Sequence, residues 1–404
     1  MSKRILIVSE YFYPEEFKIN DIALDWKDKG YLVDVITTVP TYPESKVYDS
    51  YKNRWYQKES WNGIDIYRVK SVTGYKNSLF KKLLKYFSFM IFGTILSLKI
   101  GKKYDYIFGF QVGALSSMLP AVMLNKFYNK NITLWIQDIW PDSIYAYGFK
   151  KTVFLKYILD SFVKFIYKYS TNFAVTSKDF NNKIEPYLDK NKIIYYAPNW
   201  ADEINKTDDF FRLSEDKKVH FTFAGNIGKV QNLDNIIKAY SLLEDKYIKK
   251  SQLNIIGDGS ELEKLKDIVK KMDIKNIIFW GRQPRKDIGK YLLSSDFLIV
   301  SLIDNPVFRL TIPAKIQTYI ASSKPILAIL NGASARIINE NKLGYSANPN
   351  DEDSIRKLFI QAIETDTYRI EQFSKNCNYL TNNVFNKDKI IEQLLRLTLG
   401  EYKG

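Results

Sequence analysis

The chain alternates short apolar runs with longer stretches of helical periodicity, and it does so in two series. The first series contains RILIVSEY (4–11), YLVDVITTV (31–39), IDIYRV (64–69), YIFGFQ (106–111), ITLWIQD (132–138), NFAVTS (172–177) and IIYYAPN (193–199). The second contains HFTFAGNIG (220–228), QLNIIGDGS (252–260), NIIFWGR (276–282), DFLIVSLI (296–303), PILAIL (325–330) and GYSANP (344–349). Strands that alternate with helices are typical of parallel sheets covered by helices on both faces, so the sequence predicts an α/β fold.

A charged stretch of low apolar content, residues 201–218, separates the two series and indicates a linker. The chain has 404 residues, which is more than one ordinary domain contains. We therefore predict two doubly wound, Rossmann-like domains, 1–200 and 205–380, that face each other across a cleft. A C-terminal helix within 381–404 is expected to pack back on the first domain.

The chain contains one cysteine, Cys377, and one histidine, His220. A single cysteine excludes a disulfide framework and a thiolate metal cluster. Serine hydrolases, zinc hydrolases and histidine-based catalysts need histidines that this chain lacks. His220 alternates with apolar neighbours in a strand pattern, which favours a structural role. We expect neither a bound metal nor an organic cofactor.

The net charge of +15 favours an anionic partner, such as nucleic acid, acidic lipid or a phosphorylated substrate. Lysines outnumber arginines and no zinc-finger or RNP-type motif occurs, so we expect no nucleic acid. The N-terminus enters a strand directly, with no signal-peptide pattern. A cytoplasmic protein that is peripheral on the inner face of the membrane fits these features.

Residues 78–103 combine basic and aromatic side chains. Their uncharged run, Tyr86 to Leu98, is too short to span a hydrocarbon core of about 30 Å. Because both flanks carry lysines, we expect this stretch to contact an anionic membrane surface. The lysines of the stretch are Lys81, Lys82, Lys85, Lys99, Lys102 and Lys103. The alternative is an ordinary buried helix with a lysine edge.

The stretch FRLTIPAKIQTYIASSKPI (308–326) contains the start of a helix that follows a buried strand. Pro313 occupies a first-turn position, and Thr311 is the candidate N-cap. In a doubly wound sheet, helix N-termini at the carboxyl ends of strands hold anionic ligands. Lys315, in the first turn, would add a positive charge.

Two further strand-to-helix turns of the second half carry glycines. In FAGNIGKVQ, Gly225 and Gly228 allow close backbone approach and Lys229 adds charge. The turn GDGS (257–260) lacks the third glycine of a dinucleotide fingerprint, and no P-loop sequence occurs. Each turn alone is more simply a tight turn, but three at one sheet edge favour a phosphate-binding face.

Eight stretches of the chain are similar to segments of one family. They are EYFYPEEFKINDIALDWKDKGYLVDVITTVPTYPESKVYDSY, WIQDIWPDSIYAYG, YAPNWADE, FAGNIGKVQNLDNII, IIGDGSELEKLK, FWGRQPRKDIGKYL, TIPAKIQTYIASSKPILAILNGASARII and GYSANPND. Together they resemble the family-4 retaining glycosyltransferases of GT-B fold, and most closely the bacterial branch that builds capsular polysaccharide and O-antigen. The resemblance implies transfer of a hexosyl or N-acetylhexosaminyl group from a nucleotide donor to a polyprenyl-diphosphate-linked acceptor. We expect the donor nucleotide to be UDP. It implies no metal.

The resemblance also implies donor-site residues in the second domain. Many relatives carry two glutamates around the proline turn; here the first place falls near Leu310 and the second at Thr318. An arginine and a lysine of relatives are replaced by Asn226 and Gln231. The donor-binding residues carried over are Gly225, Asn226, Lys229, Gly257, Asp258, Arg282, Pro313, Gln317 and Thr318.

A departing nucleoside diphosphate develops negative charge, which fixed cations must stabilise. We predict that Arg309 and Lys315 supply this charge. The simpler interpretations are that Lys315 is a solvated helix lysine and that Arg282 caps a turn.

In the first domain, the loop PEEFKIND (14–21) stands where the family faces the diphosphate and the acceptor, but the usual glycines are missing. The implied contacts there are Glu15, Glu16, Lys18 and Asn20. Three further candidates follow the strand that ends near residue 138: Gln137, where relatives often have a histidine, the carboxylate Asp138 and the apolar wall Trp140. Asp138 is the predicted catalytic carboxylate, and its alternative role is to cap a turn.

Two other functions remain open on the sequence. A nucleotide-sugar epimerase of the same fold would need buried acid and base residues, including histidines. A basic α/β protein that binds membranes or nucleic acid without catalysis would explain the missing glutamates.

Overall fold

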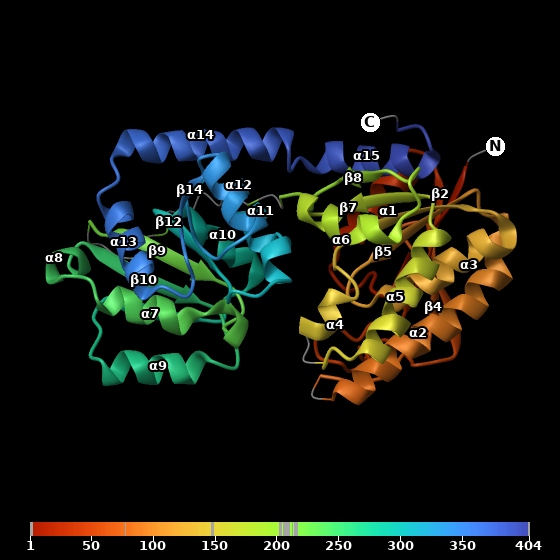
Figure 1. The fold of residues 1–404 in the computed structure, drawn as a ribbon, viewed down its shortest axis with the longest axis horizontal. Helices are drawn as coiled ribbons and strands as arrows, with labels where there is room; N and C mark the ends of the chain where they lie inside the picture. The colour runs from red at the N-terminus through yellow and green to blue at the C-terminus, as the bar shows by residue number, and fades with distance from the viewer. Residues whose placement is uncertain are drawn as a thin grey trace. The chain divides into compact units, whose positions relative to one another are not determined.

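The computed structural model describes residues 3–76, 78–146, 149–201, 204, 211, 213 and 217–402. The chain divides into two compact units (Figure 1). Unit 1 comprises Met1–Pro198 together with Asp388–Gly404, and unit 2 comprises Asn199–Lys387. Most of the predicted linker between the two series lies outside the described residues.

Unit 1 is built on an eight-stranded sheet of order β3-β4-β2-β1-β5-β6-β7-β8. Its strands are β1 (Arg4–Ser9), β2 (Leu32–Thr38), β3 (Tyr56–Trp61), β4 (Ile64–Val69), β5 (Tyr106–Gln111), β6 (Asn131–Ile136), β7 (Asn172–Val175) and β8 (Ile194–Tyr196). All neighbouring strands are parallel except β3 and β4. The central strand β1 is apolar and buried on both faces, as a parallel sheet between two helical layers requires.

Strand β3 was absent from the sequence prediction. It pairs antiparallel with β4 through a two-residue turn, Asn62–Gly63, so that Trp61 lies opposite Ile64. Both turn residues have positive φ, 48° and 81°, as the tight hairpin turn requires. Because β3 is an edge strand with alternating half-exposed polar residues, it has no apolar run.

The α-helices of unit 1 are α1 (Lys18–Asp28), α2 (Leu79–Ile100), α3 (Leu119–Tyr128), α4 (Asp142–Ala146), α5 (Val153–Lys168), α6 (Asn181–Ile184) and α15 (Lys387–Leu399). Helices α2, α3 and α5 cover one face of the sheet, and α1 and α15 lie on the other (Figure 1). The Trp26 indole of α1 donates to the Ile391 carbonyl of α15 at 3.4 Å. The C-terminal helix therefore belongs to the same unit as the first strand.

Unit 2 contains a six-stranded parallel sheet of order β11-β10-β9-β12-β13-β14. Its strands are β9 (Val219–Ala224), β10 (Ser251–Ile256), β11 (Ile277–Gly281), β12 (Phe297–Ser301), β13 (Ile326–Ile329) and β14 (Gly344–Ala347). Its helices are α7 (Leu233–Ser241), α8 (Asp245–Ile248), α9 (Leu262–Lys271), α10 (Arg285–Leu293), α11 (Ala314–Ala321), α12 (Ala333–Glu340), α13 (Glu352–Ile363) and α14 (Thr367–Asn383). Apolar clusters fill both sides of this sheet, one around Phe221 and one around Ile316.

The strand order of unit 2 reverses at β9. The chain runs from β9 to β10 and β11 on one side, and returns to β12 on the other side. In open α/β sheets such a reversal separates the loops at the carboxyl ends of the two strands and leaves a crevice there. The loops after β9 and β12 are thus where unit 2 is expected to bind a ligand.

Among the described residues, one helical segment is long and apolar enough to cross a membrane. It is Phe80–Lys103, in which an 18-residue window has a mean hydropathy of 1.5 and is 28% buried within the structure. The sequence analysis judged only the thirteen-residue uncharged run and found it too short. The whole segment meets the length requirement, but one face of α2 packs on unit 1 through Phe89, Leu96 and Ser97.

Candidate functional site

Lys315 lies at the strand reversal of unit 2. It is in the first turn of α11, and its ammonium lies 3.7 Å from the ring centroid of Phe223 on β9. The helix is held there by Tyr319, whose hydroxyl accepts from the Ala224 amide at 3.2 Å. The register of β9 and β12, continued from Leu298↔Thr222, brings Ser301 level with Gly225. Lys315 and Ser301 therefore both lie at the carboxyl edge of this sheet, near the strand reversal.

Among the described residues, the Lys315 ammonium has no hydrogen-bond or ion-pair partner, and it lies over the Phe223 ring. Burial lowers the pKa of Lys315 to about 7. The buried Ser301 hydroxyl likewise has no hydrogen-bond partner among the described residues. A partly buried cation and a free hydroxyl at a helix N-terminus are the groups that an anion would pair with.

In the structure, the glycines of the turns after β9 and β10 have a packing role. The Gly225 amide donates to Ile256 and the Gly257 amide donates to Gly281, both at 2.9 Å, so neither amide is free for a phosphate. A Cβ on Gly257 would lie 1.8 Å from the Gly225 carbonyl oxygen, and a Cβ on Gly225 would lie 2.4 Å from Cε of Lys315. The glycines therefore let two turns approach each other and leave room for the lysine side chain.

Arg309, the second predicted cation, is already neutralised. Its guanidinium binds the Asp304 carboxylate with two hydrogen bonds of 2.5 Å, on an exposed surface. This bond holds the pKa of Asp304 below its usual range. The structure thus does not support Arg309 as a free charge for a diphosphate, because Asp304, five residues earlier, compensates it.

The start of α11 also differs from the prediction. Pro313 is the N-cap residue, and Thr311 ends a preceding 3-10 helix, where its hydroxyl donates to Phe308. The expectation that Thr311 caps α11 is therefore wrong. Gln317 is buried, and its amide nitrogen, in the orientation that satisfies both partners, donates to the carbonyls of Pro313 and Ala314 at 2.9 and 3.1 Å. Gln317 thus stabilises the helix start.

Thr318 is half-buried and donates to the Ala314 carbonyl at 3.3 Å, which leaves its oxygen able to accept a further hydrogen bond. Three other predicted donor residues lie on the same sheet edge. Asn226 and Lys229 are exposed on the turn after β9, and Arg282 is exposed after β11. Asp258, on the turn after β10, accepts from the Gly259 amide at 2.7 Å.

Lys229 lines a small cavity of about 130 Å³ at this edge. The lining residues are Gly228, Lys229, Asn232, Leu233, Asp234, Glu261, Lys264, Leu265 and Ile303. Its charged lining residues come from the turn after β9, from α7 and from the start of α9, whereas the loop after β12 contributes only Ile303. Lys229 therefore lies at the same sheet edge as Lys315.

In unit 1, the PEEFKIND loop is tied to the loop after β2. The Glu15 carboxylate is buried and accepts from the amides of Thr41 and Tyr42 at 2.8 and 2.7 Å. Burial raises the pKa of Glu15 despite these hydrogen bonds. In this structure one oxygen of the Glu15 carboxylate anchors the loop. Asn20 donates to the Glu15 carbonyl at 2.7 Å, while Glu16 is exposed and Lys18 is half-buried.

Asp138 and Trp140 both bind the loop that follows β5. Asp138 accepts from the Gly113 amide at 2.6 Å, and the Trp140 indole donates to the Gly113 carbonyl at 2.9 Å. Burial raises the pKa of Asp138, although the Gly113 amide and the Lys82 charge oppose this shift. The backbone amide of Gln137 donates to the Gln111 carbonyl at 2.9 Å, which continues the pairing of β5 with β6. These residues lie together at the carboxyl ends of β5 and β6.

A buried ion pair at the end of β1 was missed by the sequence analysis. Glu10 and Lys85 are each 1% exposed, and their charged atoms lie 2.8 Å apart. Lys85 also donates to the Tyr11 hydroxyl at 2.7 Å and lies over the rings of Tyr11 and Tyr75. The second Glu10 oxygen has no hydrogen-bond partner among the described residues. A glutamate that directly follows an apolar strand was the signal available in the sequence.

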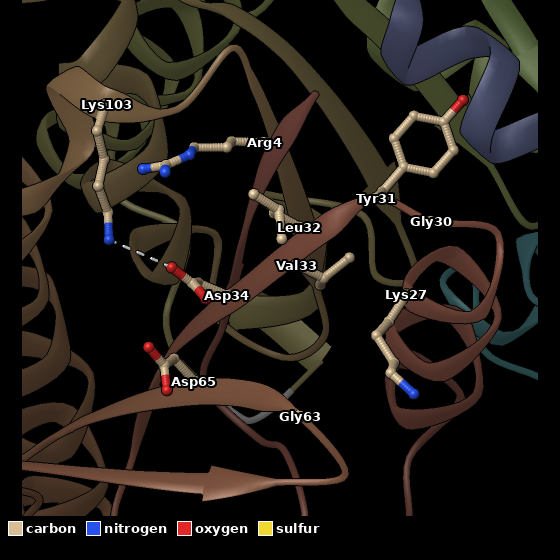
Figure 2. Close-up of a pocket in the computed structure, with 10 residues that line it drawn as sticks. All are labelled: Arg4, Lys27, Gly30, Tyr31, Leu32, Val33, Asp34, Gly63, Asp65 and Lys103. Atoms are coloured by element: carbon tan, nitrogen blue, oxygen red, sulfur yellow. Dashed lines mark hydrogen bonds and ion pairs between the residues drawn. The ribbon is translucent and has the colours of Figure 1, made fainter. Parts of the chain in front are cut away.

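A further cavity of unit 1 lies at the opposite edge of its sheet. Figure 2 shows this cavity of about 460 Å³ and its lining residues Arg4, Lys27, Gly30, Tyr31, Leu32, Val33, Asp34, Gly63, Asp65 and Lys103. Its two carboxylates are already paired, with Asp34 at 3.4 Å from Lys103 and Asp65 at 2.6 Å from Lys58. Because the cavity is at the amino ends of β1 and β2, it is not where a doubly wound sheet binds its substrate.

His220 also lies away from the candidate sites. It is buried near the amino end of β9, and its amide donates to Asp296 at 2.7 Å. In the described residues, no three His, Cys, Asp or Glu side chains gather in the manner of a metal site. The polar groups suited to a substrate are thus Lys315 and Ser301 in unit 2, and Asp138 with its neighbours in unit 1.

Comparison with solved structures defines the class of fold. The chain resembles Alr3699/HepE of Anabaena, solved in complex with UDP, with a TM-score of 0.66, 12% sequence identity and 100% coverage of both chains. Together with the two parallel sheets, this likeness confirms the predicted GT-B fold class.

Sequence comparison adds a family to the fold. Residues 205–383, which lie in unit 2, match the model of the family Glycosyl transferases group 1. Two curated relatives are the probable glycosyltransferase WbjE of Pseudomonas aeruginosa and the putative colanic acid biosynthesis glycosyl transferase WcaI of Escherichia coli. WbjE is 28% identical over 62% of this chain and 66% of its own length, slightly under two thirds. WcaI is 25% identical over 74% of this chain and 76% of its own length.

Proposed function

We propose that this chain is a glycosyltransferase that moves a sugar from a UDP-linked donor to a polyprenyl-diphosphate-linked acceptor in the assembly of a surface polysaccharide. The family match of unit 2 and the names of WbjE and WcaI support the reaction class. The observation that carries the proposal is the uncompensated ammonium of Lys315 at the strand reversal of unit 2.

Lys315 suits the leaving group of this reaction. A departing UDP develops negative charge on its diphosphate, and a fixed cation in a crevice of low polarity stabilises that charge more than an exposed one would. The α11 N-terminus adds its dipole. Because a protein cation would supply the charge, we propose a metal-independent reaction. The solved complex of HepE with UDP favours this nucleotide.

The transferred group is proposed to be a hexosyl or N-acetylhexosaminyl group, and its anomeric configuration is proposed to be retained. We place no carboxylate as a covalent nucleophile. The acceptor hydroxyl would attack on the face that the diphosphate leaves, and its proton would pass to the leaving diphosphate. Asp138 of unit 1, a carboxyl whose pKa is raised by burial, would orient that hydroxyl.

A lipid-linked acceptor requires the enzyme to work at a membrane, and we propose the cytoplasmic face. The epimerase alternative loses support from the position of His220. An epimerase would need histidines near the nucleotide, and this one lies at the amino end of β9, opposite the crevice.

The test is a thermal-shift titration with UDP of the wild type, Lys315→Met and Lys324→Met. Lys324 is the matched control, because it is a partly buried lysine of unit 2 whose pKa is also lowered by burial, but it lies at the other end of α11. UDP at 100 times its dissociation constant should add about 2.7 kcal/mol of stability to the wild type. Lys315→Met should lose most of this gain and Lys324→Met should keep it.

An equal UDP response in Lys315→Met and the wild type would refute the role of this lysine. The transfer itself is tested separately, by UDP release from a UDP-sugar in the presence of a lipid-linked acceptor. A protein that binds UDP but never releases it from a donor would be the non-catalytic alternative.

A further inference from the structure

Exposed apolar side chains are concentrated on one side of unit 1. Ten of the twenty large apolar residues that are exposed in the described part of the chain lie on α2, on the start of α5 or at Trp55. On α2 they are Phe80, Leu84, Phe87, Ile91 and Ile95. This spacing forms a single stripe along the helix. Trp55 extends the stripe, because its ring meets that of Phe92 edge to face at 5.3 Å.

The start of α5 was not singled out by the sequence. Its first two turns expose Val153 (89%), Phe154 (74%), Tyr157 (72%) and Ile158 (46%). Such exposure of four neighbouring large side chains is unusual for a surface that only meets water. The exposure of this patch, like that of the α2 stripe, indicates a surface that binds something other than water.

Helices α2, α3 and α5 belong to one layer (Figure 1), and α3 contacts both α2 and α5. Tyr128 of α3 donates to the Leu98 carbonyl of α2 at 2.9 Å, and Lys126 of α3 lies 5.4 Å from the ring of Phe165 on α5. Both α2 and α5 begin at the carboxyl edge of the sheet, where Asp138 lies, since each follows a strand and leads back to the next. The two apolar surfaces thus flank the same helix and start near the same edge.

The charges around these surfaces are positive. The exposed lysines of the two helices and of the chain just before α5 are Lys81, Lys99, Lys150, Lys151, Lys156, Lys164 and Lys168. Helix α2 has no acidic residue, and the single acid of α5, Asp160, is bound by Lys156 and Tyr187. A surface of this kind is complementary to the headgroups of anionic lipids and to the acyl chains beneath them.

The packing of α2 excludes a transmembrane role in this fold. Lys85 points to the inside of unit 1, where it pairs with Glu10, and Phe89, Leu96 and Ser97 are buried on the same side. A helix that spans a bilayer would have to leave the sheet and break this ion pair. Lys85 therefore does not contact lipid, contrary to the sequence expectation that grouped it with the other lysines of residues 78–103.

We propose that α2, Trp55 and the start of α5 form one docking face that lies in the plane of an anionic bilayer. Phe80, Phe87, Phe154 and Tyr157 enter the interface, and the surrounding lysines pair with lipid headgroups. The proposal rests on the proposed function, because a lipid-linked acceptor gives the enzyme a reason to dock. It adds α5 to the membrane surface and fixes the helices parallel to the membrane.

The test is co-sedimentation of the full chain with vesicles of phosphatidylcholine, with and without phosphatidylglycerol. Two double variants probe the two helices: Phe87→Ser with Ile91→Ser, and Phe154→Ser with Tyr157→Ser. The control is Tyr368→Ser with Tyr379→Ser, which removes two aromatic residues of similar exposure from α14 of unit 2. Each test pair should weaken binding to the anionic vesicles by about tenfold or more, and the control pair should not.

Wild-type binding should need phosphatidylglycerol and weaken with added salt. Unchanged vesicle binding in the α5 variant would remove α5 from the face, and unchanged binding in both variants would overturn the proposal. A change of oligomeric state in either variant, without loss of vesicle binding, would identify a protein interface instead and also overturn it. UDP thermal shifts and transfer to a water-soluble acceptor analogue should stay normal in all three variants, so a failure of the proposed activity would appear there and not in sedimentation.

Discussion

The carboxyl edges of the two sheets differ in whether their buried charged groups have partners. In unit 2, the Lys315 ammonium has no acidic partner and the Ser301 hydroxyl has no hydrogen-bond partner among the described residues. In unit 1, the buried charges are already matched, with Lys85 against Glu10 and Asp138 against the Gly113 amide. A buried cation without a partner lowers stability unless a ligand neutralises it. A paired charge needs no charged ligand, and it can still organise a site.

This difference separates the two proposed substrates. Unit 2 has the electrostatics of a site for a diphosphate. Unit 1 has hydrogen-bonding carboxyl and amide groups with little net charge, which suit the hydroxyl groups of a sugar. The four predictions below test whether the units differ in this way, from the largest expected effect to the smallest.

The first prediction concerns the matched pair of unit 1. Lys85→Met leaves the Glu10 carboxylate buried without its cation and should lower the free energy of unfolding by about 3–5 kcal/mol. Urea denaturation measures this change. Lys81→Met, which removes an exposed lysine one turn earlier, should stay within about 0.5 kcal/mol of the wild type.

Removal of both charges sharpens this test. Glu10→Gln with Lys85→Met should recover part of the lost stability, because no uncompensated charge then remains buried. If Lys85→Met is as stable as Lys81→Met, the ion pair does not organise the edge of unit 1, and the contrast between the units fails.

The second prediction separates transfer from donor binding. Asp138→Asn keeps a group that can accept from the Gly113 amide but removes the carboxylate. It should reduce turnover by about 10²-fold, because the acceptor hydroxyl loses the carboxylate that orients it. The affinity for UDP, measured by thermal shift, should not change, since that site is assigned to unit 2. Normal turnover would return Asp138 to the loop-anchoring role that its bond to Gly113 already gives it.

The fold was largely predictable from the sequence, and the reason is visible in its strands. Buried parallel strands such as β1 and β12 are continuous apolar runs, and such runs can be recognised without knowledge of their partners. The edge strand β3 was missed because its side chains alternate between half-exposed and exposed. The Asn62–Gly63 pair was nevertheless a sufficient signal for its hairpin with β4.

The site was less predictable, because charge compensation depends on folding. Lys315 and Arg309 are both cations near the start of α11, and the sequence gives no reason to prefer one of them. The structure pairs Arg309 with Asp304 and leaves Lys315 without an acid. In the same way, Lys85 resembled its neighbours on a basic helix, yet it is the one whose position on the helix turns it to Glu10.

The third prediction uses the pKa of Lys315. Burial lowers this pKa to about 7, and a bound diphosphate would raise it again, so binding would be accompanied by proton uptake. The affinity for a UDP-sugar should therefore be highest below pH 7 and fall by up to about tenfold per pH unit above it. A UDP-sugar is the right probe, because the terminal phosphate of free UDP titrates near pH 6 and would add its own pH dependence.

Two variants and one stability measurement test this linkage. Lys315→Met should bind the UDP-sugar weakly, with an affinity that does not depend on pH in this way. The affinity of Lys315→Arg, which keeps its charge, should also be independent of pH in this range. Without ligand, the folded pKa of about 7 lies below the unfolded value of 10.5, so the unfolded state binds more protons between these values. The free energy of unfolding of the wild type should then rise between pH 7 and pH 10.5. An identical rise in Lys315→Met would show that another group causes it.

The smallest expected effect belongs to Thr318, which the resemblance to GT-B glycosyltransferases places at a glutamate position. Its hydroxyl already donates to the Ala314 carbonyl at 3.3 Å, so it can offer only a lone pair to a ribose hydroxyl, with no charge. One neutral hydrogen bond is worth about 0.5–1.5 kcal/mol. Thr318→Ala should therefore weaken uridine and UDP by the same few-fold factor and leave inorganic diphosphate binding unchanged. Thr381→Ala on α14, which removes a threonine with the same bond to the carbonyl four residues earlier, is the matched control and should change neither ligand. If Thr318→Ala weakened diphosphate as well as uridine, the threonine would act on the charge at Lys315, and the division of the donor site into a nucleoside part and a charged part would have to be abandoned.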